Sequence, residues 1–346
     1  MKKSLIALSV LATVAASANA QSNISIYGIA DAGFVYSKNG SGDNVTAIGS
    51  GVQSGSRLGF RGAEDIGGGT KAIFTLEQGY NINDGTQGQG RLFGRQSFVG
   101  LNNSHWGELR LGRQYNPIRP ALESVNPFEI GLAGNILNIF DAHGERADNT
   151  VNYQTPKISG FSAQAAYSFG QNATQDLGRQ RGVSANYANG PVYVVLAYHN
   201  TNTLNSTTTP TAETGDKHTT MLGGVYNFGI LKAHAAYAQN KGENATGVTN
   251  LDSKDMMVGV TVPVGGAGKF LASYMRKKND LISNGDSKLW AIGYTYDLSK
   301  RTDLYASYGK MDNDSGVNRT LASSALGAIA NGADPSTFNI GMRHKF

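Results

Sequence analysis

Residues 161–169 read Phe-Ser-Ala-Gln-Ala-Ala-Tyr-Ser-Phe, and this stretch decides the fold class. Its odd-numbered positions are all apolar or aromatic, whereas three of its four even-numbered positions are polar. Successive side chains of a β-strand point to opposite faces of a sheet, so this period of two predicts a strand with one apolar and one polar face. The same alternation recurs at residues 258–263, 289–298 and 338–346. We therefore expect an all-β protein.

The composition excludes several classes of protein. Only 16% of the 346 residues are charged, and 45 are glycine, a share about twice the usual one. The absence of cysteine excludes a disulfide scaffold, thiolate metal sites and a cysteine nucleophile. The 30 basic and 25 acidic residues are too evenly balanced for a nucleic-acid-binding surface. No nucleic-acid partner is expected.

Residues 1–20 have the pattern of a secretory signal peptide. Lys2 and Lys3 precede an apolar stretch from Leu5 to about Ala16, and residues 18–20 form an A-x-A cleavage site. The apolar stretch is too short to cross the hydrocarbon core of a bilayer, which takes about 20 helical residues. We expect export, cleavage after residue 20, and a single domain formed by residues 21–346.

Short and long connections alternate along the rest of the chain. Seven short turns and eight longer polar segments predict about sixteen antiparallel strands, an even number as in bacterial outer-membrane barrels. The longer segments are residues 38–54, 81–91, 116–148, 171–180, 201–217, 241–252, 278–286 and 311–333.

The polar faces of the strands indicate which way the barrel is turned. Gly, Ser, Gln, Asn and Arg are too polar and too small for a packed interior, but they suit a water-filled lumen. Closure of the sheet also gives every backbone N–H and C=O group of the strands a hydrogen-bond partner, which lipid cannot provide. No repeat of 20–50 residues supports the competing β-helix, and a secreted sandwich is the other alternative. Tyrosines near the expected strand ends are predicted to form interfacial girdles; they are Tyr27, Tyr36, Tyr80, Tyr115, Tyr198 and Tyr237.

Five pieces of sequence lie in the order found in a known family. They are IYGIADAG at 26–33, SRLGFRGAEDIGGG at 56–69, GRQSFVGL at 94–101, GELRLGR at 107–113 and the terminal Phe346. In these pieces the chain resembles the general porins of Gram-negative bacteria, of the beta-proteobacterial, neisserial-like type. The resemblance implies a homotrimer of sixteen-stranded transmembrane barrels that passes small hydrophilic solutes and ions by diffusion. It also implies contact with outer-membrane lipid and lipopolysaccharide, and a Phe346 that the barrel-assembly machinery reads as an insertion signal.

Residues 116–148 form the longest predicted loop. A loop of this length is uncommon in a compact domain unless it is functional or disordered. Between residues 117 and 148 it carries two arginines and five acidic residues, together with enough apolar side chains to pack against a wall. The resemblance implies that this third loop folds into the lumen and constricts it. Its candidate acidic residues at the constriction are Glu123, Glu129 and Asp141.

Arginines are the expected opposing charges on the barrel wall. If Leu58 faces lipid, Arg57 and Arg61 face the lumen; if Phe98 and Gly100 face lipid, Arg95 faces the lumen. Arginine keeps its charge at any physiological pH, so several can sit close together on a rigid wall.

The resemblance points to the same positions. Anion-preferring members of the family carry an arginine cluster that matches Arg57, Arg95 and Arg146. Three such charges would give a passing anion about 1 kcal/mol in physiological salt, which is a several-fold preference and no tight site. Arg113 shares the parity of Leu111, so it is expected to face outward and to form a subunit contact near the three-fold axis.

An outer-membrane barrel can also be an enzyme, a substrate-specific channel or a closed structural barrel. A lipase-like or protease-like barrel would use a histidine site, but the six histidines show no metal-site spacing; they are His105, His143, His199, His218, His234 and His344. A substrate-specific channel would need a row of aromatics or lysines along the lumen, and a barrel without conductance would need a sealed lumen. Residues 312–316 imitate a calcium loop but lack its terminal Glu. No cofactor or metal is expected.

Overall fold

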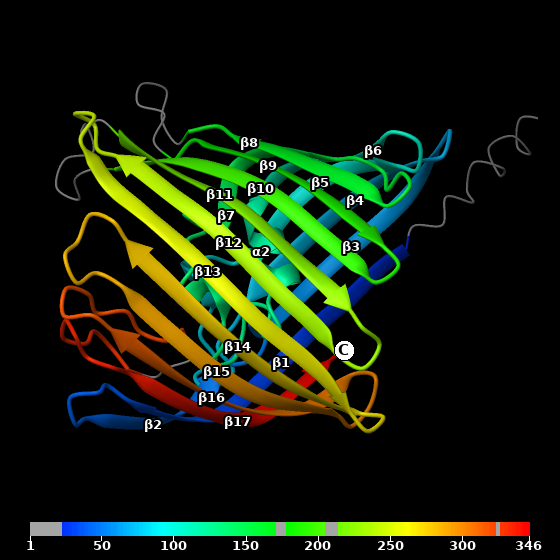
Figure 1. Cartoon of the computed structure of the whole chain (residues 1–346). Helices are drawn as coiled ribbons and strands as arrows, with labels where there is room; N and C mark the ends of the chain where they lie inside the picture. The colour runs from blue at the N-terminus through cyan, green and yellow to red at the C-terminus, as the bar shows by residue number, and fades with distance from the viewer. Residues whose placement is uncertain (1–22, 171–177, 205–213, 323–325) are drawn as a thin grey trace, which may run out of the picture.

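The computed structural model describes residues 23–170, 178–204, 214–322 and 326–346, which form one closed antiparallel sheet (Figure 1). The expected signal peptide lies outside the described residues. The strands are β1 (Asn23–Lys38), β2 (Asn44–Ser50), β3 (Arg57–Gly67), β4 (Thr70–Gly79), β5 (Gln96–Asn103), β6 (Gly107–Tyr115), β7 (Arg146–Gln154), β8 (Phe161–Ser168), β9 (Gln180–Asn189), β10 (Val192–Leu204), β11 (Thr214–Asn227), β12 (Lys232–Glu243), β13 (Thr249–Val264), β14 (Gly268–Asn279), β15 (Ser287–Asp297), β16 (Thr302–Asn313) and β17 (Ser336–Lys345).

The seventeen strands occupy sixteen positions in a barrel. One end of β1 pairs with β2 through residues 32–38, and its other end pairs with β3 through residues 23–29, so β2 and β3 are two halves of one strand. On its other edge β1 pairs with β17, from Ile29 opposite Lys345 to Lys38 opposite Ser336. This pairing closes the sheet. The predicted sixteen-stranded antiparallel barrel is confirmed.

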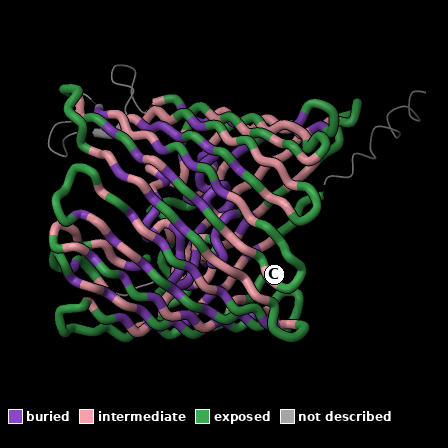
Figure 2. Tube along the Cα trace, in the orientation of Figure 1, coloured by how far each residue is buried: buried purple, intermediate pink, exposed green. Residues whose placement is uncertain are grey.

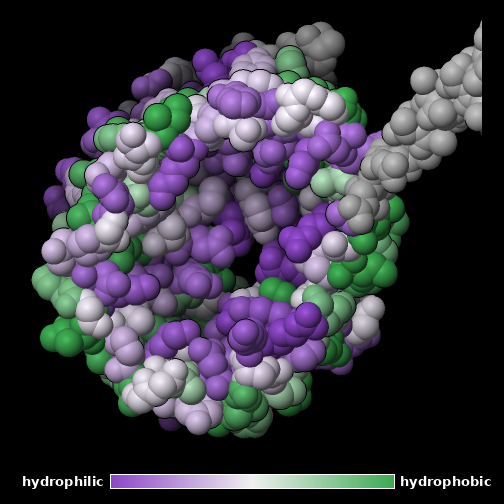
Figure 3. Space-filling model, turned by 90° about the vertical axis from the view of Figure 1, so that its right-hand side faces the viewer, coloured by the Kyte–Doolittle hydropathy of each residue, from purple (hydrophilic) through white to green (hydrophobic). Residues whose placement is uncertain are grey.

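The apolar faces of the strands point outward, as predicted. In β8, Phe161 and Tyr167 are exposed on the outer surface, whereas Ser168 is buried. The same alternation of exposed and less exposed residues follows the strands around the barrel (Figure 2). Seen from the end that carries the short turns, hydrophilic side chains surround a central opening and hydrophobic ones follow the outer rim (Figure 3). Among the described helices, none is long and apolar enough to cross a membrane.

The girdle prediction is wrong for two tyrosines. Tyr198 and Tyr237 are exposed on the outer surface, as a girdle requires. Tyr27 instead donates a hydrogen bond to Glu77 at 2.9 Å, and the hydroxyl of Tyr115 accepts one from Arg95 at 2.7 Å. Both rings therefore belong to the inner face of the wall.

Residues 51–56 separate β2 from β3, where a loop over residues 38–54 was expected. That expectation is wrong for residues 44–50, which form β2. At the break the carboxylate of Asp31 accepts the N–H groups of Gln53 at 3.0 Å and Ser54 at 2.6 Å, and the Tyr305 hydroxyl at 2.7 Å. Gly51 takes a φ of +65° that favours glycine, and its N–H donates to the Asp31 carbonyl. One fully buried carboxylate thus organises the break.

The described helical segments are short. They are η2 (Gly88–Gly90), α2 (Ile118–Val125) and η3 (Ile136–Asn138), and the last two lie between β6 and β7. One face of α2 is apolar, and Leu122 and Val125 are fully buried there. They belong to one apolar cluster with Val195 and Met221 of the wall, whose chain neighbours, leucines in both cases, are exposed on the outer surface. The segment therefore packs on the face of the sheet opposite the exposed apolar side chains (Figure 1).

Candidate functional site

Three arginine side chains converge on the ring of Tyr115, the last residue of β6. The Tyr115 hydroxyl accepts hydrogen bonds from Arg95 at 2.7 Å and from Arg146 at 3.0 Å. The guanidinium carbons of Arg119 and Arg146 lie 4.1 and 4.6 Å from the centre of the ring. Such cation–π contacts let one neutral side chain hold several positive charges together.

Arg57 joins this group through Gly55. Its Nε donates to the Gly55 carbonyl at 2.9 Å. A Cβ atom at Gly55 would lie 2.9 Å from Nη1 of Arg95, so glycine lets the Arg95 guanidinium approach the backbone. We refer to Arg57, Arg95, Arg119 and Arg146 as the arginine cluster.

Carboxylates neutralise most of the arginine cluster. Arg95, which is only 4% exposed, pairs with Glu77 at 2.8 Å. Arg119 pairs with Glu123 and, at 3.1 Å, with Glu145. No carboxylate of the described residues forms an ion pair with Arg57. Four guanidinium groups therefore face three carboxylates, and the cluster keeps an excess of about one positive charge.

Arg95 joins the cluster, but the outward orientation predicted for Phe98, from which an inward Arg95 was expected, is wrong. Val99 is 57% exposed and Phe98 only 9%, so the odd-numbered residues of β5 face outward. Arg95 precedes Gln96, where β5 begins, so the preceding loop sets its direction.

Arg61 lies apart from the cluster. It is on the same strand as Arg57 but four residues nearer the short turn, about 13 Å along β3. Its guanidinium carbon is 5.0 Å from the centre of the Tyr27 ring, and its side chain is exposed. It adds positive charge to that end of the wall.

Asp141 also lies apart from the arginines. Its carboxylate pairs with Lys277 of β14 at 2.9 Å, and Lys277 contacts Asp255 at 2.6 Å. Burial raises the pKa of Asp141, but Lys277, Arg319 and His143 outweigh this and hold the pKa below its usual value. Burial lowers the pKa of His143 and keeps that ring neutral. Asp141 thus ties the loop to the wall.

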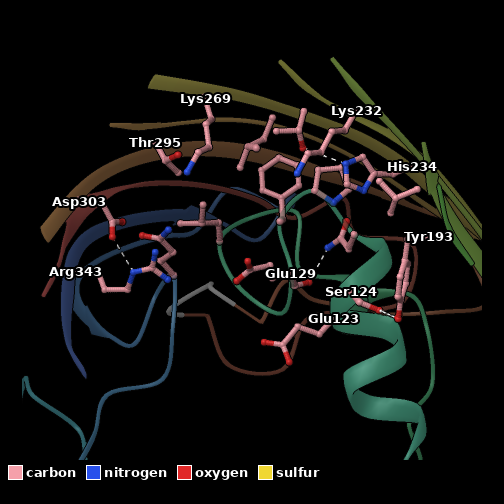
Figure 4. A pocket seen from close by; sticks show the side chains of 18 of the residues that line it. Glu123, Ser124, Glu129, Tyr193, Lys232, His234, Lys269, Thr295, Asp303 and Arg343 are labelled. Carbon is pink, nitrogen blue, oxygen red and sulfur yellow. Dashed lines mark hydrogen bonds and ion pairs between the residues drawn. The ribbon is translucent and has the colours of Figure 1, made fainter. Parts of the chain in front are cut away.

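Glu123 and Glu129 of the loop line a cavity of about 690 Å³. Its opposite side is formed by strand ends at the short turns, which carry Lys232, His234 and Lys269 (Figure 4). The predicted acidic residues are therefore divided: two face this cavity, and Asp141 anchors the loop.

Arg113 makes an ion pair within its own chain. Its Nη1 lies 2.6 Å from Asp148, which also pairs with Arg91 at 2.8 Å. Phe346 exchanges backbone hydrogen bonds with Gly28 at 3.0 and 3.1 Å and so extends the pairing that closes the barrel. Within the described residues, no three His, Asp or Glu side chains are placed to hold a metal ion.

Sequence reasoning missed Arg119, Glu77 and Tyr115. A signal existed for Glu77, because it alternates with Phe74 and Leu76 in β4 and so shares the polar face. Arg119 was counted only as one charge of the loop, since its place depends on the fold of α2. Tyr115 was assigned to a girdle because tyrosine near a strand end is typical of one.

Comparisons with known proteins agree with this architecture. The family model described as Gram-negative porin matches residues 7–316. An outer membrane porin protein of Bordetella pertussis is 34% identical, and outer membrane porin protein 32 of Delftia acidovorans is 33% identical, with 100% of each chain covered. The structure of an anion-selective porin from Comamonas acidovorans superimposes with a TM-score of 0.85 at 30% identity, covering 94% of this chain and 100% of that one. The chain therefore belongs to the family of Gram-negative porins, the channel-forming barrels of the bacterial outer membrane.

Proposed function

We propose that the channel passes small hydrophilic solutes and ions by diffusion and weakly prefers anions. The observation that carries this is the arginine cluster, with four guanidinium groups and three carboxylates around Tyr115. The related porin from Comamonas acidovorans is named as anion-selective, which supports the same preference. We also propose that the chain transports without catalysis.

The preference is weak because the carboxylates cancel most of the charge. An anion about 6 Å from one uncompensated guanidinium gains roughly 0.7 kcal/mol in water, and physiological salt about halves this. One net charge then corresponds to a preference of about twofold. Weak attraction is also what conduction needs, since a tightly held ion would not leave.

The loop between β6 and β7 is proposed as the constriction. Its apolar side packs against inward-facing residues of the wall, and the Asp141–Lys277 pair ties it to β14. Its Arg119 lies within the arginine cluster. A loop fixed in this way narrows the passage beside the cluster, so a solute must pass close to the charges.

A homotrimer is proposed as the functional assembly, as the resemblance implies, with Arg113 in the subunit contact. Leu111 and Val99 lie exposed on the outer surface of the adjoining strands and would join the same contact. The terminal ring of Phe346 is 46% exposed, which leaves it accessible to the barrel-assembly machinery. Contacts of the outer surface with lipid and lipopolysaccharide belong to the same proposal.

Reversal potentials across a planar bilayer in a KCl gradient test the anion preference. We expect a wild-type potential on the anion side, and Arg57→Glu should move it to the cation side. Arg61→Glu makes the same change of charge on the same strand outside the cluster, so its shift should be smaller. A wild-type potential that favours cations would overturn the proposal.

A further inference from the structure

The cavity lined by Glu123 and Glu129 adjoins the arginine cluster at Glu123, which pairs with Arg119. It lies between residues 120–132 of the loop and the ends of the strands from β10 to β17 at the short turns. No arginine of the cluster lines it. At about 690 Å³ it has the size of a small-molecule site.

The backbone presents Glu129 to the cavity in a strained conformation. Its φ is +54°, in the left-handed region that residues other than glycine rarely occupy. The buried side chain of Asn126 fixes this turn, donating to the carbonyls of Glu129 at 2.7 Å and Gly134 at 2.8 Å. Strain of this kind persists where the surroundings enforce it, and it clusters at functional sites. Among the described residues, the Glu129 carboxylate has no ion pair or hydrogen bond.

The opposite wall presents an ammonium group without a partner. Lys232, the first residue of β12, makes no ion pair or hydrogen bond with any described side chain. Its neighbour Lys269 pairs with Asp297 at 3.2 Å, but both side chains are about half exposed, so this pair is weak. Arg343 forms an ion pair with Asp303 at 3.0 Å and donates a hydrogen bond to the Ser54 hydroxyl at 2.6 Å.

His234 does not compete for a charged solute. Its Nδ1 contacts the Val125 carbonyl at 3.0 Å and its Nε2 contacts the Thr261 hydroxyl at 3.1 Å. The cavity is therefore left with one unpaired carboxylate on the loop and one unpaired ammonium on the wall (Figure 4). The apolar side chain of Phe128 also lines the cavity.

We propose that this cavity is a weak binding station for zwitterionic solutes, the class formed by free amino acids and short peptides. Glu129 attracts the ammonium end and Lys232 the carboxylate end, so a zwitterion satisfies both charges. A simple anion meets repulsion from Glu129, and a simple cation meets repulsion from Lys232. The inference rests on the proposed open channel, because the solute reaches the cavity through it.

Solute-induced current noise in planar bilayers tests this station. The full mature protein is reconstituted at low salt, and glycylglycine is added on the short-turn side. N-acetylglycinamide, which is similar in size but uncharged, serves as the reference solute. We expect the noise to saturate with glycylglycine at a concentration about fivefold below any saturation with the neutral solute, as two screened ion pairs would give.

Substitutions assign the effect to the two charges. Glu129→Gln and Lys232→Gln, each compared with its own solute-free current, should reduce the fivefold difference to about twofold, because one ion pair is left in each variant. Glu64→Gln and Lys71→Gln remove exposed charges of the same kinds at the β3–β4 turn, outside the cavity, and should leave the difference intact. The exchange of both charges, Glu129→Lys with Lys232→Glu, should retain a preference for the zwitterion.

The possible results separate this station from the channel itself. Ordinary conductance steps with the same noise for both solutes overturn the station and leave the channel standing. So does a fivefold difference that neither single substitution reduces. The absence of any conductance step overturns the proposed channel, and the station with it.

Discussion

Tyr115 holds the arginine cluster together without contributing charge. Its hydroxyl accepts from two guanidinium groups and its ring stacks with two, so neutral chemistry keeps like charges close. Arg57 is the member without a carboxylate partner among the described residues, and it supplies the excess charge. Selectivity therefore depends on Arg57, and the shape of the cluster depends on Tyr115.

Tyr115→Phe separates these two contributions. The substitution keeps the ring but removes the acceptor of two charged donors, which should cost about 2 kcal/mol of the free energy of unfolding. The reversal potential should keep its sign because no charge is lost. Urea titration of the detergent-folded barrel measures the first quantity and bilayer recording the second. Tyr237→Phe, on the outer surface, should change stability by less than about 0.5 kcal/mol; equal losses in both variants would contradict the assigned role.

The break between β2 and β3 connects the barrel wall to the loop. Asp31 organises residues 51–56, and the Val52 carbonyl within them accepts the N–H of Leu132 at 2.7 Å. Leu132 and Glu129 both have positive φ, so this contact helps to hold the strained turn that lines the cavity. The break between β2 and β3 thus helps to position the turn of the β6–β7 loop that lines the cavity.

Asp31→Asn should loosen this connection. The N–H groups of Gln53 and Ser54 both donate to Oδ2 of Asp31, and the Tyr305 hydroxyl donates to Oδ1. The single amide oxygen of asparagine can replace only one of these two acceptors, so the hydroxyl or the two N–H groups lose their acceptor, at a cost of about 1–3 kcal/mol. We expect a lower urea midpoint and stronger spontaneous current fluctuations. Asp65→Asn, in the exposed β3–β4 turn, is the matched control. Quiet currents in Asp31→Asn would show that the break does not hold the loop.

The Lys277 anchor gives the loop a dependence on pH. Because the pKa of Asp141 is lowered in the folded protein, its pairing stabilises the fold above the unfolded pKa, near 3.9, and is lost as pH falls through the folded value. His143 also makes the fold less stable as pH falls. Burial lowers its pKa in the folded protein, whereas in the unfolded chain it takes up a proton below about pH 6.5.

Lys277→Met should reverse the way in which Asp141 makes the stability of the fold depend on pH. Without the ammonium, the buried carboxylate of Asp255 and the partly buried one of Asp141 lose the cation between them, which should cost about 3–5 kcal/mol near neutral pH. Protonation then relieves the repulsion, so the variant should gain stability on acidification to pH 4 where the wild type does not. Urea midpoints are measured between neutral pH and pH 4. The His143→Gln substitution is present in both proteins, so that titration of this histidine does not add to the effect of the carboxylates. Parallel pH profiles for the two proteins would contradict the anchor.

At the scale of the whole molecule, the alternation of apolar and polar residues predicted the features that the strands alone determine. The outward apolar face and the closed barrel follow from a period of two, which recurs in strands from one end of the described chain to the other. The predictions that were wrong concern residues whose positions depend on contacts with groups far away in the sequence. Asp31 sets a break more than twenty positions away, and the register shift between Gly112 and Gln114 turns Tyr115 to the inner face. Such contacts have no local pattern in the sequence.

The inversion of the barrel can be tested on two neighbouring residues of β8. Ala165 faces outward and Gln164 inward, within the stretch whose alternation decides the fold. Arginine on the lipid-facing side of such a barrel costs about 2–4 kcal/mol near the midplane, whereas a charge facing water in the lumen costs little. Ala165→Arg should therefore lower the urea midpoint in lipid vesicles far more than Gln164→Arg, although both introduce the same side chain one position apart. Equal losses would mean that the two faces meet the same surroundings, which is incompatible with a barrel that encloses water and faces lipid.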